Sequence, residues 1–77
     1  SIEATLRAHI SWTEDGKYLI HSSHPMKAIE VFSPSGSLLA RHELHNSDTD
    51  FVAERDSRLL LIRITYEDGN TEEHKVL

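Results

Sequence analysis

Two stretches of the chain share one design, in which β-rich runs are joined by a few residues suited to a tight turn. The first, 29–40, turns through Ser-Pro-Ser-Gly at 33–36, and the second, 60–77, turns through Glu-Asp-Gly-Asn at 67–70. Proline presets φ early in a turn, and glycine accepts the positive φ that its end requires. The repeated signal predicts two β-hairpins and therefore a chain built from antiparallel strands.

An alternation of apolar and polar residues predicts another hairpin near the start of the sequence. In 6–12, one face of a strand carries Leu6, Ala8, Ile10 and Trp12, and the other face carries Arg7, His9 and Ser11. An Asp-Gly pair at 15–16 then turns the chain into a second run, 18–21. Trp12 and Tyr18 face each other across this hairpin, as a core pair or as an aromatic platform for a sugar.

The rest of the chain reads as short strands separated by polar connections. Pro25 cannot donate a backbone hydrogen bond, so we expect a sheet edge or a crossing beside it. The residues at 45–50 and 54–58 are polar and are predicted as loops. The prediction is an all-β fold of about seven strands, at 6–12, 18–21, 28–32, 38–44, 51–53, 60–67 and 71–77.

The register of the last hairpin follows from which side chains must be buried. A two-residue turn at Asp-Gly would place Lys75 opposite Ile62, on the core face. A three-residue loop at 68–70 places Val76 opposite Ile62 and leaves Lys75 in water. We therefore predict the three-residue loop, with a left-handed residue at Gly69 or Asn70.

Composition restricts the kinds of function that the chain can carry. Its 77 residues form a single domain, 1–77, with no cysteine for a disulfide or a thiolate zinc site. The net charge is −5, and the eight basic residues are scattered, so nucleic acid is not an expected partner. No apolar run is long enough to cross a bilayer. The chain has no leader sequence and starts without Met, which predicts a piece excised from a longer secreted protein.

Neither a metal site nor an active site is predicted, and no cofactor is expected. The six histidines include His21-x-x-His24 and His42-x-x-His45, but residues three apart on a strand point to opposite faces. Acidic pairs occur at 14–15, 48–50 and 67–68, in predicted turns where aspartate usually bonds to local backbone. The sequence contains no nucleophile elbow and no glycine-rich phosphate loop. The domain is predicted not to be an enzyme.

Five segments in a fixed order carry a resemblance to a known family. They are Tyr-Leu-Ile-His-Ser-Ser at 18–23, Pro-Met-Lys-Ala-Ile-Glu-Val-Phe at 25–32, Gly-Ser-Leu-Leu at 36–39, Leu-Ile-Arg-Ile at 61–64 and Glu-His-Lys-Val-Leu at 73–77. From Trp12 onward the chain resembles the C-terminal sorting domain of type IX (Por) secretion system cargo. The resemblance implies an immunoglobulin-like sandwich of about seven antiparallel strands. It implies a signal module, read as a folded domain, that directs a secreted protein across the outer membrane.

The resemblance also implies partners and a set of signal residues. The partners are the outer-membrane type IX translocon, its shuttle protein, a sortase, the upstream cargo domain and anionic lipopolysaccharide at the cell surface. The implied location is the periplasm in transit, then the outer-membrane surface or the medium. The residues that match the family pattern, expected to act through shape and exposed backbone, are Gly36, Ile29, Val31, Ile62, Ile64, Lys75, Val76 and Leu77. The chain has Arg-Leu-Leu at 58–60 where the family commonly has Gly-x-Tyr, which leaves cleavage and retention of the domain both open.

A second function class stays open beside the sorting signal. An immunoglobulin-like accessory domain of an extracellular enzyme, binding carbohydrate or a protein partner, would have the same strand pattern. The charged run Glu-Glu-His-Lys at 72–75 fits either class, because charges on an edge strand discourage unwanted pairing.

Overall fold

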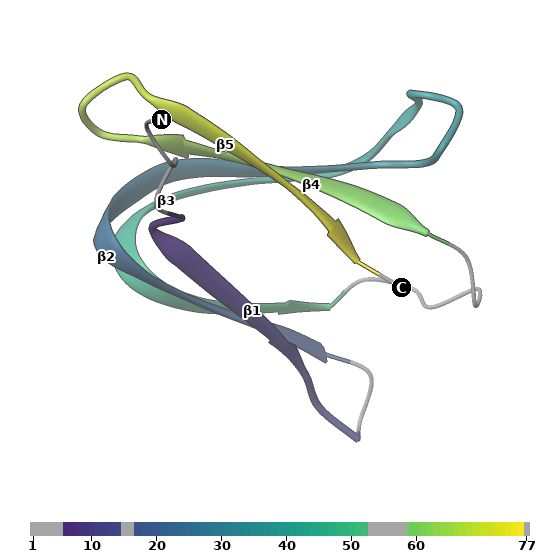
Figure 1. Ribbon diagram of the computed structural model, residues 1–77, viewed down its shortest axis with the longest axis horizontal. Coiled ribbons are helices and arrows are strands. Elements are labelled where there is room, and N and C mark those ends of the chain that lie inside the picture. The colour runs from purple at the N-terminus through teal and green to yellow at the C-terminus, as the bar shows by residue number, and fades with distance from the viewer. Residues whose placement is uncertain (1–5, 15–16, 53–58, 77) are drawn as a thin grey trace, which may run out of the picture.

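The computed structural model describes residues 6–14, 17–52 and 59–76, with side chains described in all of these except 45–52. Within them the chain forms five strands that pair only in antiparallel fashion, and no helix (Figure 1). The strands are β1 (Ala8–Trp12), β2 (Lys17–Phe32), β3 (Leu38–Val52), β4 (Leu60–Tyr66) and β5 (Thr71–Val76). The prediction of an all-β antiparallel fold is confirmed.

Two of the strands are long and curved, which is why the structure shows five strands where the sequence predicts seven. The predicted strands 18–21 and 28–32 are parts of β2, and those at 38–44 and 51–53 fall on β3, apart from Ala53, which lies outside the described residues. The loop predicted at 45–50 is wrong, since Asn46 pairs with Met26 and Asp48 with His21. Asparagine and aspartate are depleted in strands. Here the ladder with β2 satisfies the backbone N–H and C=O groups of this segment, and this outweighs the low strand propensity of its side chains.

Pro25 lies where β2 exchanges one neighbour for another. β3 follows one edge of β2, while the other edge pairs first with β1, up to Ser22, and then with β4, from Met26 onward. In the gap, the Ser23 amide donates to the Arg7 carbonyl at 3.0 Å, and the Glu67 amide donates to the Pro25 carbonyl at 3.1 Å. A residue that has no N–H is tolerated here because no ladder partner stands opposite it. Of the two predicted alternatives, a sheet edge or a crossing, the structure shows a change of neighbouring strand beside Pro25.

The curled sheet closes around one apolar core. In one half, β1 and the first part of β2 contribute Ala8, Tyr18 and Ile20, and in the other half β4 contributes Leu60, Ile62 and Ile64, each at most 8% exposed. The two halves bury each other's inner faces, which is the favourable term in folding. Trp12 and Tyr18 pair as predicted, with ring centroids 4.3 Å apart, and the burial of Tyr18 (2% exposed) favours the core interpretation over a sugar platform.

The two hairpin turns have the same geometry. In each, the residue before a three-residue loop donates its amide to the carbonyl of the residue after it, Ser33 to Ser37 at 2.9 Å and Tyr66 to Asn70 at 2.8 Å. The third loop residue is a glycine in both cases, with φ of +92° at Gly36 and +88° at Gly69. The predicted loop length and the left-handed Gly69 are confirmed.

The register of the last hairpin differs from the prediction by two residues. The loop occupies 67–69 instead of 68–70, so Ile62 lies opposite His74, and Val76 lies opposite Leu60. Lys75 is still exposed. A shift of two residues leaves every side chain on the same face, so the burial argument could not distinguish these two registers.

We expect Gly69→Ala to lower the free energy of unfolding by about 1–2 kcal/mol, the cost of a left-handed residue with a side chain. No atom lies within 4 Å of the added Cβ, so the cost is backbone strain without a clash. Gly69→Asn should cost less, because asparagine tolerates this conformation. Urea denaturation measures the change, with Ser35→Ala in the other turn as the control. Equal losses for the alanine and asparagine variants would contradict the strain argument.

Candidate recognition surface

The four apolar residues of the expected signal set are core residues. Ile29 and Val31 in β2 and Ile62 and Ile64 in β4 are each at most 1% exposed. Both strands are central and pair on two edges, β2 with β3 and β4, and β4 with β2 and β5. Their side chains and their backbone are therefore both occupied inside the domain. They hold the sheet together, and of the four, Ile62 also lines the pocket described below.

The remaining members of the set lie near the surface. Gly36 is exposed in the turn between β2 and β3, and Lys75 is exposed on β5. Val76 is half-buried and packs against the core. Leu77 lies outside the described residues. Of the whole set, Gly36 and Lys75 are the described residues best placed to meet a partner.

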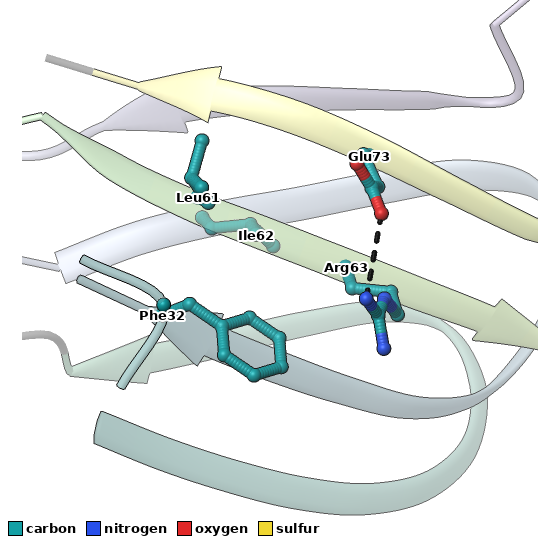
Figure 2. Close-up of a pocket in the computed structure, with 6 residues that line it drawn as sticks. Phe32, Leu61, Ile62, Arg63 and Glu73 are labelled. Atoms are coloured by element: carbon teal, nitrogen blue, oxygen red, sulfur yellow. Dashed lines mark hydrogen bonds and ion pairs between the residues drawn. The ribbon is translucent and has the colours of Figure 1, made fainter. Parts of the chain in front are cut away.

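A shallow pocket on the outer face brings Gly36 close to β5. It has a volume of about 270 Å³ and lies over β4, between the end of β2 and β5 (Figure 2). The Arg63 guanidinium lies 5.1 Å from the centre of the Phe32 ring, and its Nη2 is 3.5 Å from Oε1 of Glu73. The residues that line the pocket are Phe32, Gly36, Leu61, Ile62, Arg63 and Glu73.

The ladder explains why this pocket has an apolar floor and a charged border. One row of paired residues across β3, β2, β4 and β5 consists of Leu38, Phe32, Leu61 and Lys75. The neighbouring row alternates in charge and consists of Arg41, Glu30, Arg63 and Glu73. Leu38 is 52% exposed and the bulged Leu39 is 57% exposed, so the apolar row continues to the edge of the sheet. The surface can accept an apolar group flanked by charge.

The Glu72 carboxylate ties β5 to β1. Its Oε2 accepts from the Arg7 amide at 2.8 Å, and its Oε1 accepts from the Ala8 amide at 3.0 Å. The same Oε1 also accepts from the Tyr66 hydroxyl at 3.2 Å and from Nε2 of His74 at 2.7 Å. The side chains of Glu72 and His74 are only 11% and 12% exposed. The edge strand is therefore held in place by a nearly buried, fully hydrogen-bonded carboxylate.

The Arg7 side chain makes two further contacts, with the last residue of β4 and with the turn that follows it. Its guanidinium lies 4.9 Å from the centre of the Tyr66 ring and donates to Oδ2 of Asp68 at 2.9 Å. Hydrogen bonds from the Asn70 amide and from Arg7 lower the pKa of Asp68. Asp68 thus bonds to local backbone in a turn, as predicted for this acidic pair.

The surroundings of Glu72 set the ionisation states of Glu72 and Tyr66. Burial alone would raise the pKa of Glu72, but hydrogen bonds from the Arg7 amide, His74 and the Ala8 amide outweigh it, and the pKa lies below its ordinary value. Burial, together with the charge and hydrogen bond of Glu72, raises the pKa of the Tyr66 phenol well above its ordinary value. Glu72 is thus an ionised acceptor and Tyr66 a neutral donor over the physiological range.

The sequence analysis missed Glu72, although a signal for it was present. Residues of one strand alternate between faces, and the predicted register places Val76 on the buried side of the last strand. The same alternation places Glu72 on that side. The interpretation of 72–75 as edge-strand charge applies to the exposed Glu73 and Lys75, whereas Glu72 and His74 are largely covered.

No known protein-family model matches the chain, and no curated protein matches it either. Among the residues whose side chains are described, no three histidine, cysteine, aspartate or glutamate residues lie close enough together to hold a metal ion. The described part of the chain also contains no helix able to span a bilayer. The function must therefore be argued from the chain itself.

We expect Glu72→Gln to lower the free energy of unfolding at neutral pH by about 1–3 kcal/mol, since an amide cannot accept all the bonds that the carboxylate accepts. Because the pKa of Glu72 is lowered on folding, its contribution is complete above the ordinary glutamate pKa and is lost as pH falls through the folded-state value. The difference between the wild type and the variant should therefore shrink in acid. Urea unfolding at a series of pH values measures it.

Glu73→Gln is the matched control, since the same substitution one residue along removes only an exposed ion pair. Its expected cost is below about 1 kcal/mol. Similar losses for the two variants would show that the Glu72 hydrogen bonds do not stabilise the domain.

Proposed function

We propose that this domain is a non-catalytic C-terminal signal module that directs a secreted protein through the type IX secretion system and to the cell surface. The proposal joins the family resemblance of the sequence to one structural observation. That observation is an ordered edge strand, β5, held rigidly against the rest of the domain by Glu72. A signal that is read in the folded state needs such a fixed element.

β5 has the properties of a strand that another protein can bind. Among the described strands it pairs only with β4, so its outer edge has no ladder partner. A receptor that adds a strand to this edge gains main-chain hydrogen bonds, while pockets read alternate side chains. Thr71, Glu73 and Lys75 are the exposed side chains of β5. Lys75 has no ion pair with any described residue, so its charge is available to a partner.

The pocket supplies a second element of recognition next to that edge. Glu73 of β5 forms one wall, and Gly36, from the other hairpin, lines it as well. A partner that engages β5 therefore meets an apolar hollow beside the added strand. Shape and backbone, with no catalytic residue, carry recognition in this proposal.

The fold that goes with this function is an immunoglobulin-like sandwich. β2 and β3 each have an irregularity where the sheet curls, at residues 21–26 of β2. If each of the two bent strands is counted as two segments, the five strands correspond to seven, which supports the proposal of a two-layer sandwich. In this proposal β1 lies in one layer, and the paired strands β4 and β5 lie in the other.

The proposal implies a definite set of partners. The outer-membrane translocon and its shuttle protein would bind the folded domain after it enters the periplasm. A sortase would then act at the cell surface, where the upstream cargo becomes attached to anionic lipopolysaccharide. Nucleic acid has no place in this scheme, in keeping with the net charge of −5.

The test is export of a reporter fused to the N-terminal side of the domain in a bacterium with a type IX system. We expect Lys75→Glu to retain the reporter in the periplasm, because it reverses an exposed charge on the edge strand. Deletion of residues 75–77 should do the same. Cell fractionation measures the distribution, and thermal unfolding of the purified domain checks that Lys75→Glu remains folded.

Lys27→Glu is the matched control, since it makes the same charge reversal at an exposed position of β2. It should leave export unchanged. If the Lys75 variant and the deletion are both exported normally, the domain is not a sorting signal. An accessory binding domain would give that result, and a glycan array with the isolated domain would then test carbohydrate binding.

A further inference from the structure

The outer edge of β5 carries main-chain groups and charges that a second copy of the same strand can match. β5 is the last strand in the order β1-β2-β4-β5, and among the described strands it pairs only with β4 (Figure 1). A two-fold axis can place one β5 antiparallel to another, so that both copies use the same surface. We propose that two copies of this chain associate edge to edge through β5, with Glu73 of each copy opposite Lys75 of the other.

The hydrogen bonds of the last hairpin determine which main-chain groups of β5 face outward. The Tyr66 amide donates to the Asn70 carbonyl, so these two residues form a hydrogen-bonded pair. Such pairs alternate with non-hydrogen-bonded ones along an antiparallel ladder. In the register of β4 and β5, the N–H and C=O groups of Thr71, Glu73 and Lys75 therefore point to the outer edge. A second strand must place its own outward groups opposite these three residues.

Charge selects one register among those that the hydrogen bonds allow. One register places the two copies of Glu73 opposite each other, and another does the same with Lys75. Like charges directly opposite each other destabilise a strand pair, whereas opposite charges stabilise it. Only the register with His74 at the two-fold axis places each Glu73 opposite a Lys75. Edge charges thus discourage pairing in the other registers and favour it in this one.

The alternating row of charges on the outer face continues across the proposed interface. Arg41, Glu30, Arg63 and Glu73 follow one another across the four strands β3, β2, β4 and β5. Nη1 of Arg41 is 3.2 Å from Oε2 of Glu30, and Nη2 of Arg63 is 3.5 Å from Oε1 of Glu73. The next residue in this row is Lys75 of the second copy, which continues the alternation in sign. Within its own chain, Lys75 forms no ion pair with any residue whose side chain is described.

β5 needs no reordering before it pairs. Its inner side is held by the Glu72 carboxylate, which accepts from the amides of Arg7 and Ala8 at 2.8 and 3.0 Å. A preorganised edge avoids the cost of ordering a strand on association. The two Glu73–Lys75 pairs add about four main-chain hydrogen bonds, over an area well below the standard interface of about 1,600 Å². We therefore expect a weak dimer, with a dissociation constant between about 1 μM and 1 mM.

Sedimentation of the purified 77-residue chain over a series of concentrations tests the inference. We expect a monomer at low concentration and a dimer at high concentration, with weaker association as salt screens the charges. The backbone amides of Glu73 and Lys75 should become more protected from hydrogen exchange as the dimer forms. A chain that stays monomeric up to about 1 mM would overturn the proposal.

Charge-reversal variants test the register. Glu73→Lys and Lys75→Glu should each weaken dimerisation by about tenfold or more, because each turns both attractive pairs of the dimer into like-charge pairs. An equal mixture of the two variants should form a heterodimer, since every lysine then lies opposite a glutamate. Recovery in the mixture also shows that both variants are folded.

Glu43→Lys is the matched control, because Glu43 is as exposed as Glu73 and pairs in the same way with an exposed arginine. It should leave dimerisation unchanged. If it weakens the dimer as much as Glu73→Lys, or if the mixed variants stay monomeric, the copies do not pair through β5 in this register. The measurement contains no secretion component, so a monomeric domain would not count against the sorting signal, and normal export of Lys75→Glu would not count against the dimer.

Discussion

The hydrogen bonds from the amides of Arg7 and Ala8, at the start of β1, to the Glu72 carboxylate join the two ends of the described chain. Glu72 and Arg7 are separated by 65 positions in the sequence, yet the carboxylate accepts from two consecutive amides there. Charged hydrogen bonds contribute about 1.5–3 kcal/mol each in favourable cases. In a domain this small, total stability is typically about 5–15 kcal/mol, so one such junction is a large share of it. Without it, β5 would be held only by its ladder with β4 and by the packing of Val76 against the core.

This junction also explains how an edge strand can be both exposed and well ordered. An unpaired edge tends to fray or to pair with other chains. Here the inner side chains of β5 are fixed by Glu72, His74 and the half-buried Val76, while its outer edge and the exposed Lys75 face water. The inner side supplies rigidity, and the outer side supplies the surface that a partner can read. The two roles use alternate residues of the same six-residue strand.

The sequence predicted the features that depend on local residue chemistry. Alternation predicted the strands, glycine predicted both left-handed turn positions, and Pro25 marked the place where β2 changes partner. The features that failed depend on distant parts of the chain. The polar residues at 45–50 became strand because β2 lies beside them. The hairpin register could not be chosen from burial, because registers two residues apart bury the same face.

The same reason explains why the surface residues were harder to predict than the core. Ile29, Val31, Ile62 and Ile64 are visible in the sequence as apolar alternation, and they prove to be core. The pocket and the Glu72 junction each require residues from separate strands to be aligned. Arg63 and Glu73 meet only because β4 and β5 pair in this register, and Glu72 reaches Ala8 only because the curled sheet brings β5 to β1.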